Sequence, residues 1–115
     1  MSHRRLIRVS LVAALAAIVI AGLLAAASSA SGPTVHIAGS TTATYHFKPK
    51  KVTVSKGTTV HWSWSSNAPH NVTFTKLGKH SATGASGSYK LKFKHAGTFK
   101  YLCTVHGFTG KVVVK

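Results

Sequence analysis

The fold is decided by the C-terminal stretch FKYLCTVHGFTGKVVVK, residues 99–115. Apolar and polar residues alternate on both sides of a short glycine-containing segment, which predicts a strand, a loop and a second strand. The apolar face is formed by Phe99, Tyr101 and Cys103 before the loop and by Val112 and Val114 after it. The only cysteine of the chain therefore lies where a strand ends, three residues before His106.

A second histidine-bearing segment, NAPHNV at residues 67–72, follows a predicted strand that contains Trp62 and Trp64. One thiolate and two imidazoles are the donor set that suits a blue-copper site. We therefore interpret His70, Cys103 and His106 as candidate metal ligands, and the rest of the chain as the scaffold that brings them together.

Period-two alternation continues through the chain from Thr34 onward, with Gly, Ser, Asn and Pro at the breaks. It predicts further strands at residues 34–38, 42–47, 51–55, 58–65, 71–76 and 88–94, and a loop at 77–86. About seven or eight short strands at this spacing favour an all-β, antiparallel β-sandwich. We expect a single domain over residues 31–115.

Residues 1–30 have the pattern of an export signal. All three arginines lie in the first ten residues, an apolar run covers residues 11–27, and small residues follow. The cut would fall after Ala30 or Ala27. An uncleaved membrane anchor is the alternative, because the apolar run is close to the roughly 20 residues that span a bilayer. The Arg4-Arg5 pair is a weak indication of twin-arginine export.

The charge balance excludes several functions. The chain has 15 Lys and Arg, no Asp or Glu, and a formal net charge of +15. Glycosidase carboxylate pairs, Ser-His-Asp triads and carboxylate sites for hard cations are therefore excluded. Such a surface attracts anions, and we expect an acidic redox partner protein or an anionic membrane surface. Solubility without a specific partner is the alternative.

For two features of the sequence, a functional and a structural interpretation both remain open. Lys90, Lys92 and Lys94 form a basic stripe on one strand face, either a docking surface for an acidic partner or a solvated sheet face. Cys103 has no second cysteine to pair with, although exported domains commonly pair theirs. Metal ligation would protect and use this thiol, whereas the alternative is a buried thiol that packs as a small apolar residue.

Three segments together resemble the cupredoxin family of plastocyanin-like and amicyanin-like type 1 copper proteins. They are YxFxPxxVxVxxGxTVxW at residues 45–62, NAPHNV at 67–72, and GTFKYLCxxH at 97–106 followed by GxVxV at 110–114. The resemblance covers nearly the whole chain after residue 34. It implies a Greek-key sandwich that binds one type 1 copper ion.

The resemblance also implies roles for individual residues. The copper ligands would be His70, Cys103 and His106, while Asn71 and Thr104 would hold the ligand loops together beside Pro69. It implies an exported, monomeric carrier of single electrons that is not an enzyme and binds no specific nucleic acid. A module for copper acquisition, delivery or buffering is the first alternative, and a metal-free anion-binding sandwich is the second.

The sequence departs from the family pattern after His106. The family places a weak axial methionine two to four residues beyond the last histidine, but the only methionine here is Met1. Phe108 and Thr109 are the residues at that place. We expect that no strong axial ligand exists and that Phe108 shields the metal. An axial Thr109 hydroxyl or a backbone carbonyl near Pro69 is the alternative.

Overall fold

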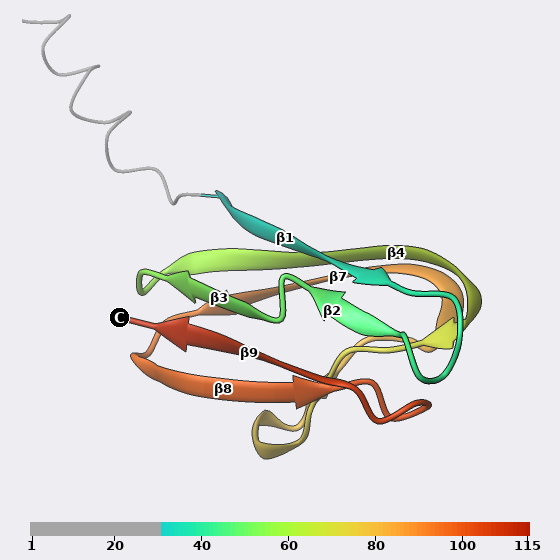
Figure 1. Ribbon diagram of the computed structural model, residues 1–115. Coiled ribbons are helices and arrows are strands. Elements are labelled where there is room, and N and C mark those ends of the chain that lie inside the picture. Colours follow the sequence, from blue (N-terminus) through green and yellow to red (C-terminus); the bar gives the residue numbers. More distant parts are fainter. Residues whose placement is uncertain (1–30) are drawn as a thin grey trace, which may run out of the picture.

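Two β-sheets packed face to face make up residues 31–115, the part of the chain that the computed structural model describes (Figure 1). One sheet has the strand order β2-β1-β4-β7 and the other has the order β3-β9-β8-β5-β6. The strands are β1 (Ser31–Ala38), β2 (His46–Lys48), β3 (Lys51–Val54), β4 (Thr58–His70), β5 (Thr73–Phe74), β6 (Lys79–His80), β7 (Gly84–Phe93), β8 (Gly97–Leu102) and β9 (Thr109–Val114). The proposed export segment, residues 1–30, lies outside the described residues.

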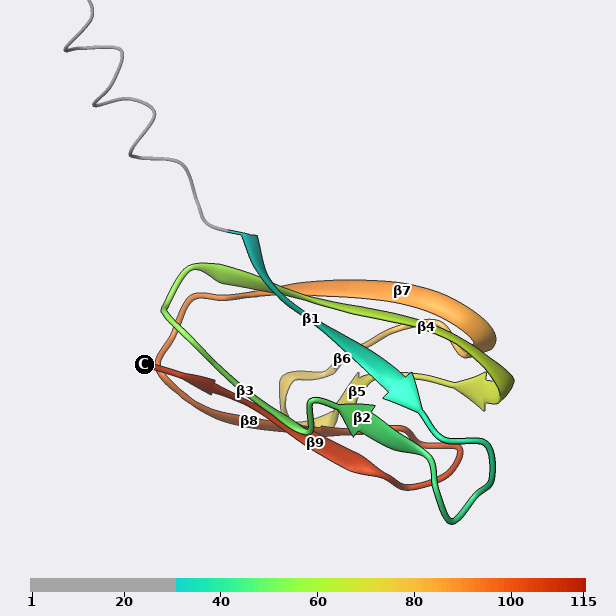
Figure 2. The same ribbon diagram turned by 45° about the horizontal axis from the view of Figure 1, so that its top comes forward.

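The all-β sandwich predicted from the alternation is confirmed, but its strand pairing is mixed rather than wholly antiparallel. β1 runs parallel to β4, and β3 runs parallel to β9. In both pairs the strands are far apart in the sequence, and the chain passes through the other sheet between them (Figure 2). Alternation reports which face is buried and carries no information on pairing direction, so it could not predict these parallel pairs.

The strand expected at residues 42–47 is shorter than predicted. Its first half is a turn, in which the Thr44 amide donates to the Thr41 carbonyl at 2.9 Å. The Thr44 hydroxyl in turn accepts from the Thr41 amide at 2.9 Å. Threonine hydroxyls compete for backbone groups in this way, and the strand β2 therefore begins only at His46.

The segment after Trp64 also differs from the prediction. β4 continues to His70 instead of ending at residue 65, and only Thr73–Phe74 of the strand expected at 71–76 is extended. A 3-10 helix, Thr75–Leu77, follows and ends at Gly78, whose φ is +63°. The expected loop at 77–86 contains β6 and the start of β7.

Aromatic side chains fill the space between the sheets. Tyr101 lies at their centre, with ring centroids 4.7 Å from Phe47, 4.9 Å from Phe74 and 5.4 Å from Trp62. Burial raises the pKa of Tyr101 to about 12. A Cβ at Gly110 would stand 2.5 Å from the Tyr101 ring, so this position in β9 requires glycine. The core thus packs tightly beneath β8, the strand that leads to Cys103.

Within residues 31–115, no helix is long and apolar enough to cross a membrane.

Candidate metal centre

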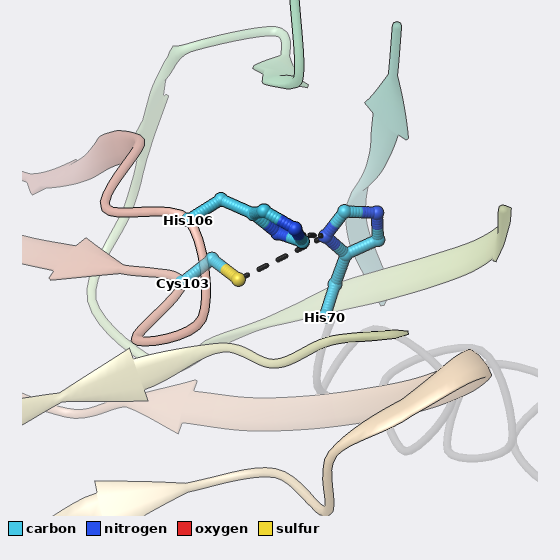
Figure 3. A group of neighbouring side chains, drawn as sticks. All are labelled: His70, Cys103 and His106. Carbon is cyan, nitrogen blue, oxygen red and sulfur yellow. Dashed lines mark hydrogen bonds between the residues drawn. The ribbon is translucent and has the colours of Figure 1, made fainter. Parts of the chain in front are cut away.

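Three side chains converge where β4 and β8 end (Figure 3). In the ribbon diagram these strand ends lie at the end of the sandwich remote from the C terminus (Figure 1). His70 Nδ1 lies 3.2 Å from His106 Nδ1 and 3.8 Å from the sulfur of Cys103. One ligand atom from each residue lies within 4.8 Å of the other two. Among the described residues, this is the one group of three or more metal-ligating side chains with such spacing.

Two elements position these side chains. His70 is the last residue of β4, and Cys103 directly follows the last residue of β8. The loop after Cys103 is closed by two hydrogen bonds: the Cys103 amide donates to the Phe108 carbonyl at 2.9 Å, and the Gly107 amide donates to the Cys103 carbonyl at 2.8 Å. Gly107 has a φ of +80°, which glycine adopts at little cost. This turn directs His106 back toward His70.

The centre is shielded from solvent on most sides. His70 and Cys103 are fully buried, whereas His106 is partly exposed. Burial, and to a lesser extent the neighbouring His106, lower the pKa of His70. Both effects favour the neutral imidazole, which is the form that binds a metal.

Ser66 holds His70 from the side away from Cys103. The Ser66 oxygen lies 2.9 Å from His70 Nε2 and donates its own proton to Asn67 Oδ1 at 3.4 Å. The amide nitrogen of Asn67 donates to the Ser40 carbonyl at 3.0 Å, which determines the orientation of that amide. In this arrangement Nε2–H of His70 donates to Ser66, so Nδ1 keeps a free lone pair directed at Cys103 and His106.

Tyr45 packs on both histidines. Its ring centroid lies 4.6 Å from that of His70 and 4.8 Å from that of His106, and its hydroxyl donates to Asn67 Oδ1 at 2.6 Å. The sequence placed Tyr45 only in the family motif at residues 45–62 and gave no role to Ser66. The available signal was weak: a buried tyrosine hydroxyl usually finds a hydrogen-bond partner, but the sequence does not show which one.

Asn71 connects the two ligand segments. Its amide nitrogen donates to the Thr104 hydroxyl at 2.7 Å and to the Thr83 hydroxyl at 3.0 Å. Its carbonyl oxygen accepts from the Thr104 amide and from the Thr73 hydroxyl, each at 3.0 Å. The residue after His70 is therefore joined by two hydrogen bonds to the residue after Cys103, which restricts how far the two loops can separate.

Comparison with known families agrees with this arrangement. The family model described as a cupredoxin-like domain matches residues 12–114. The chain belongs to the cupredoxin family. It is similar to an amicyanin from Paracoccus versutus, with 38% identity over 72 residues covering 56% of this chain and 54% of the amicyanin. It is also similar to a plastocyanin from Scenedesmus fuscus, with 33% identity over 84 residues covering 60% of this chain and 86% of the plastocyanin. The match thus spans about half the length of the amicyanin.

Solved structures show the same fold. A purple cupredoxin from Nitrosopumilus maritimus superposes with a TM-score of 0.62 at 21% identity, over 73% of this chain and all of the other. The Cu(I) form of an amicyanin variant superposes with a TM-score of 0.59 at 35% identity, over 79% of this chain and 89% of the amicyanin chain. Copper is the cofactor, and the donor set of this cupredoxin fits it: a soft thiolate and two imidazoles converge on one point.

The residues considered for the axial position lie in different places. Phe108 packs on the centre, with its ring centroid 5.5 Å from that of His70 and 4.6 Å from that of Phe47. Thr109 is the first residue of β9, where it pairs with Leu102 and is exposed. It shares the outward face with Lys111, while Gly110 between them faces the core. Pro69 directly precedes His70 and is exposed, and an axial role for a backbone carbonyl near it stays a prediction.

The lysine stripe lies on a different part of the cupredoxin fold. Lys90 and Lys92 extend outward from β7, opposite His61 and Thr59 of β4, and Lys94 follows the end of β7. The other described histidines do not belong to the ligand group; they are His36, His46, His61, His80 and His95.

Proposed function

We propose that this cupredoxin is an exported, single-domain carrier of single electrons that binds one type 1 copper ion at His70, Cys103 and His106. The observation that carries the proposal is the convergence of one thiolate and two imidazoles, all within 4.8 Å, in a largely buried site. When bound there, copper supplies a one-electron Cu(I)/Cu(II) couple. Catalysis is not part of the proposal, because the chain has no Asp or Glu and the described residues offer ligands for one centre.

The side chains around the ligands account for reversible cycling. Tyr45 packs on both histidine rings and Phe108 packs on His70, so that His70 is shielded from water and His106 only in part. Asn71 and Ser66 restrain the ligand segments, so their geometry changes little between the two oxidation states. His106 is the ligand that reaches the surface, and we propose that electrons cross there.

We propose further that the centre has no strong axial ligand and that Phe108 shields its open side. The aromatic ring of Phe108 packs on His70, whereas Thr109 belongs to the outward face of β9. A missing axial donor raises the reduction potential, because it removes electron density that favours Cu(II). A potential in the low part of the blue-copper range would contradict this part of the proposal.

Copper delivery is the alternative role, and burial argues against it. Two of the three ligands are fully buried, so loss of copper would require the ligand loops to open. We propose that residues 1–30 direct export and that residues 31–115 are the working domain, a monomer. Its partner would be an acidic redox protein attracted by the basic surface.

The first test is a visible absorption spectrum after one equivalent of Cu(II) is added to the purified protein. We expect an intense blue thiolate-to-copper band that disappears in Cys103→Ser and His106→Ala and persists in His95→Ala, which changes an exposed histidine outside the group. A colourless protein would refute the type 1 assignment. Reversible one-electron voltammetry with slow loss of copper to a chelator would support the carrier, and fast loss would support delivery.

A further inference from the structure

Three lysines stand in register across neighbouring strands of the five-stranded sheet. Lys111 of β9 lies directly opposite Lys51 of β3 on one side and Lys100 of β8 on the other. All three are exposed on the outward face of this sheet. Because adjacent strands lie about 4.8 Å apart, the three side chains leave the sheet within about 10 Å of one another.

These lysines surround a surface hollow. Its volume is about 490 Å³, and its lining consists of Lys50, Lys51, Lys100, Thr109, Gly110 and Lys111. The Lys111 amide donates to the Lys50 carbonyl at 2.9 Å, which holds the fourth lysine beside the row. The hollow is therefore lined by four lysines and a threonine, and we call it the β9 lysine site.

No side chain of the protein can neutralise this row. The chain contains no Asp or Glu, and like charges directly opposite each other on neighbouring strands are destabilising. The lysines of β7 differ, because Lys90 faces His61 and Lys92 faces Thr59. Two directly opposed lysine pairs thus concentrate positive charge at the hollow, and binding of an anion from solution would relieve it.

We propose that the β9 lysine site binds a multivalent oxyanion of the phosphate class. Phosphate oxygens accept charge-assisted hydrogen bonds from several ammonium groups at once, and lysine binds phosphate as a point charge. The Thr109 hydroxyl supplies a further donor. A monovalent anion could compensate one lysine but could not bridge the row. The proposal does not depend on the copper function, because the hollow is formed by the outward face of the sheet.

Thermal unfolding of the protein tests this proposal in sodium phosphate, sodium pyrophosphate and sodium chloride at equal ionic strength. We expect phosphate and pyrophosphate to raise the melting temperature beyond chloride and to saturate. Lys111→Gln, which removes both opposed pairs, should weaken pyrophosphate binding at least tenfold. The matched control Lys92→Gln removes one charge from an exposed strand position of the other sheet and should bind as the wild type does. In chloride, Lys111→Gln should melt higher than Lys92→Gln.

The proposal would be overturned if Lys111→Gln and Lys92→Gln weakened pyrophosphate binding equally. It would also be overturned if phosphate and chloride stabilised the protein equally. Backbone amide shifts during a phosphate titration should change most at Lys100, Thr109 and Lys111. Sedimentation with phosphatidylglycerol vesicles distinguishes the source: vesicle binding lost in Lys111→Gln assigns lipid headgroups, and phosphate binding alone assigns a free oxyanion. If the protein bound polyglutamate strongly but did not respond to phosphate, the β9 lysine site would be assigned to carboxylates and the proposal would be refuted.

Discussion

Replacing Asn71 tests how far the metal centre depends on hydrogen bonds outside its ligands. Asn71→Ala removes all four side-chain hydrogen bonds that connect the β4 end of the site with Thr73, Thr83 and Thr104. It leaves His70, Cys103 and His106 unchanged. The variant therefore separates the contribution of the loop connection from that of the donor atoms.

The structure allows the loss to be estimated. A hydrogen bond contributes about 0.5–1.5 kcal/mol net. The three threonine hydroxyls lie at exposed or partly exposed residues and can bond to water instead, so we expect the loss of about 2–4 kcal/mol of unfolding free energy in total. In a domain of about 60–100 residues this lowers the melting temperature by about 8–32 °C. Copper affinity should fall about 10–100-fold, as for other groups that support metal ligands.

The assay combines thermal unfolding of the copper-free protein with a competitive copper titration. Thr104→Val is the control, because it removes one hydroxyl but keeps the Thr104 amide that donates to Asn71; we expect a loss of about 1 kcal/mol. If Asn71→Ala loses no more stability than Thr104→Val, or binds copper as tightly as the wild type, then Asn71 does not hold the loops together.

Three further predictions concern the ligands and their neighbours. Ser66→Ala leaves Nε2 of the buried His70 without a hydrogen-bond partner, so a competition titration should show copper affinity lowered about tenfold or more. Ser66→Thr keeps the hydroxyl and should bind copper as the wild type does. Phe108→Met introduces a thioether beside His70 and should lower the reduction potential measured by voltammetry, whereas Phe108→Leu should not. The lowered pKa of His70 makes the unfolded state bind the proton more readily, so the copper-free protein should lose unfolding free energy as the pH falls below about 6.5. Unfolding curves in which this loss is unchanged in His70→Gln would contradict that assignment.

The fold could be predicted where burial alone decides it. Val60, Trp62 and Trp64 face the core as the alternation indicates, and the two sheets form the expected sandwich. Pairing direction could not be predicted, because a parallel partner such as β4 for β1 depends on contacts between distant segments. The turn before β2 was missed because the Thr44 hydroxyl takes part in the backbone hydrogen bonding.

Sequence spacing predicted the proximity of Cys103 and His106, and the family resemblance added His70, but neither predicted the side chains that support these ligands. Cys103 and His106 belong to one short loop, so their proximity follows from three residues of separation. Tyr45 reaches the two histidines only because the turn before β2 brings it to the same end of the sandwich. Ser66 reaches His70 because β4 is irregular between Ser65 and His70. No local pattern records either contact.

The absence of carboxylates affects the metal centre as well as the surface. Every group seen to orient His70 or to connect the loops is a neutral hydroxyl or amide, whereas a carboxylate partner would make the imidazole more basic and favour Cu(II). The uncompensated lysines add a positive potential that also disfavours the more highly charged oxidation state. Both effects raise the reduction potential, but salt screens only the second. We therefore expect the potential to decrease as sodium chloride is raised from about 0.01 to 0.5 M, over which the screening length falls severalfold from about 30 Å. Voltammetry of the wild type at fixed pH measures this change, and a potential independent of salt would show that the lysines do not contribute to it.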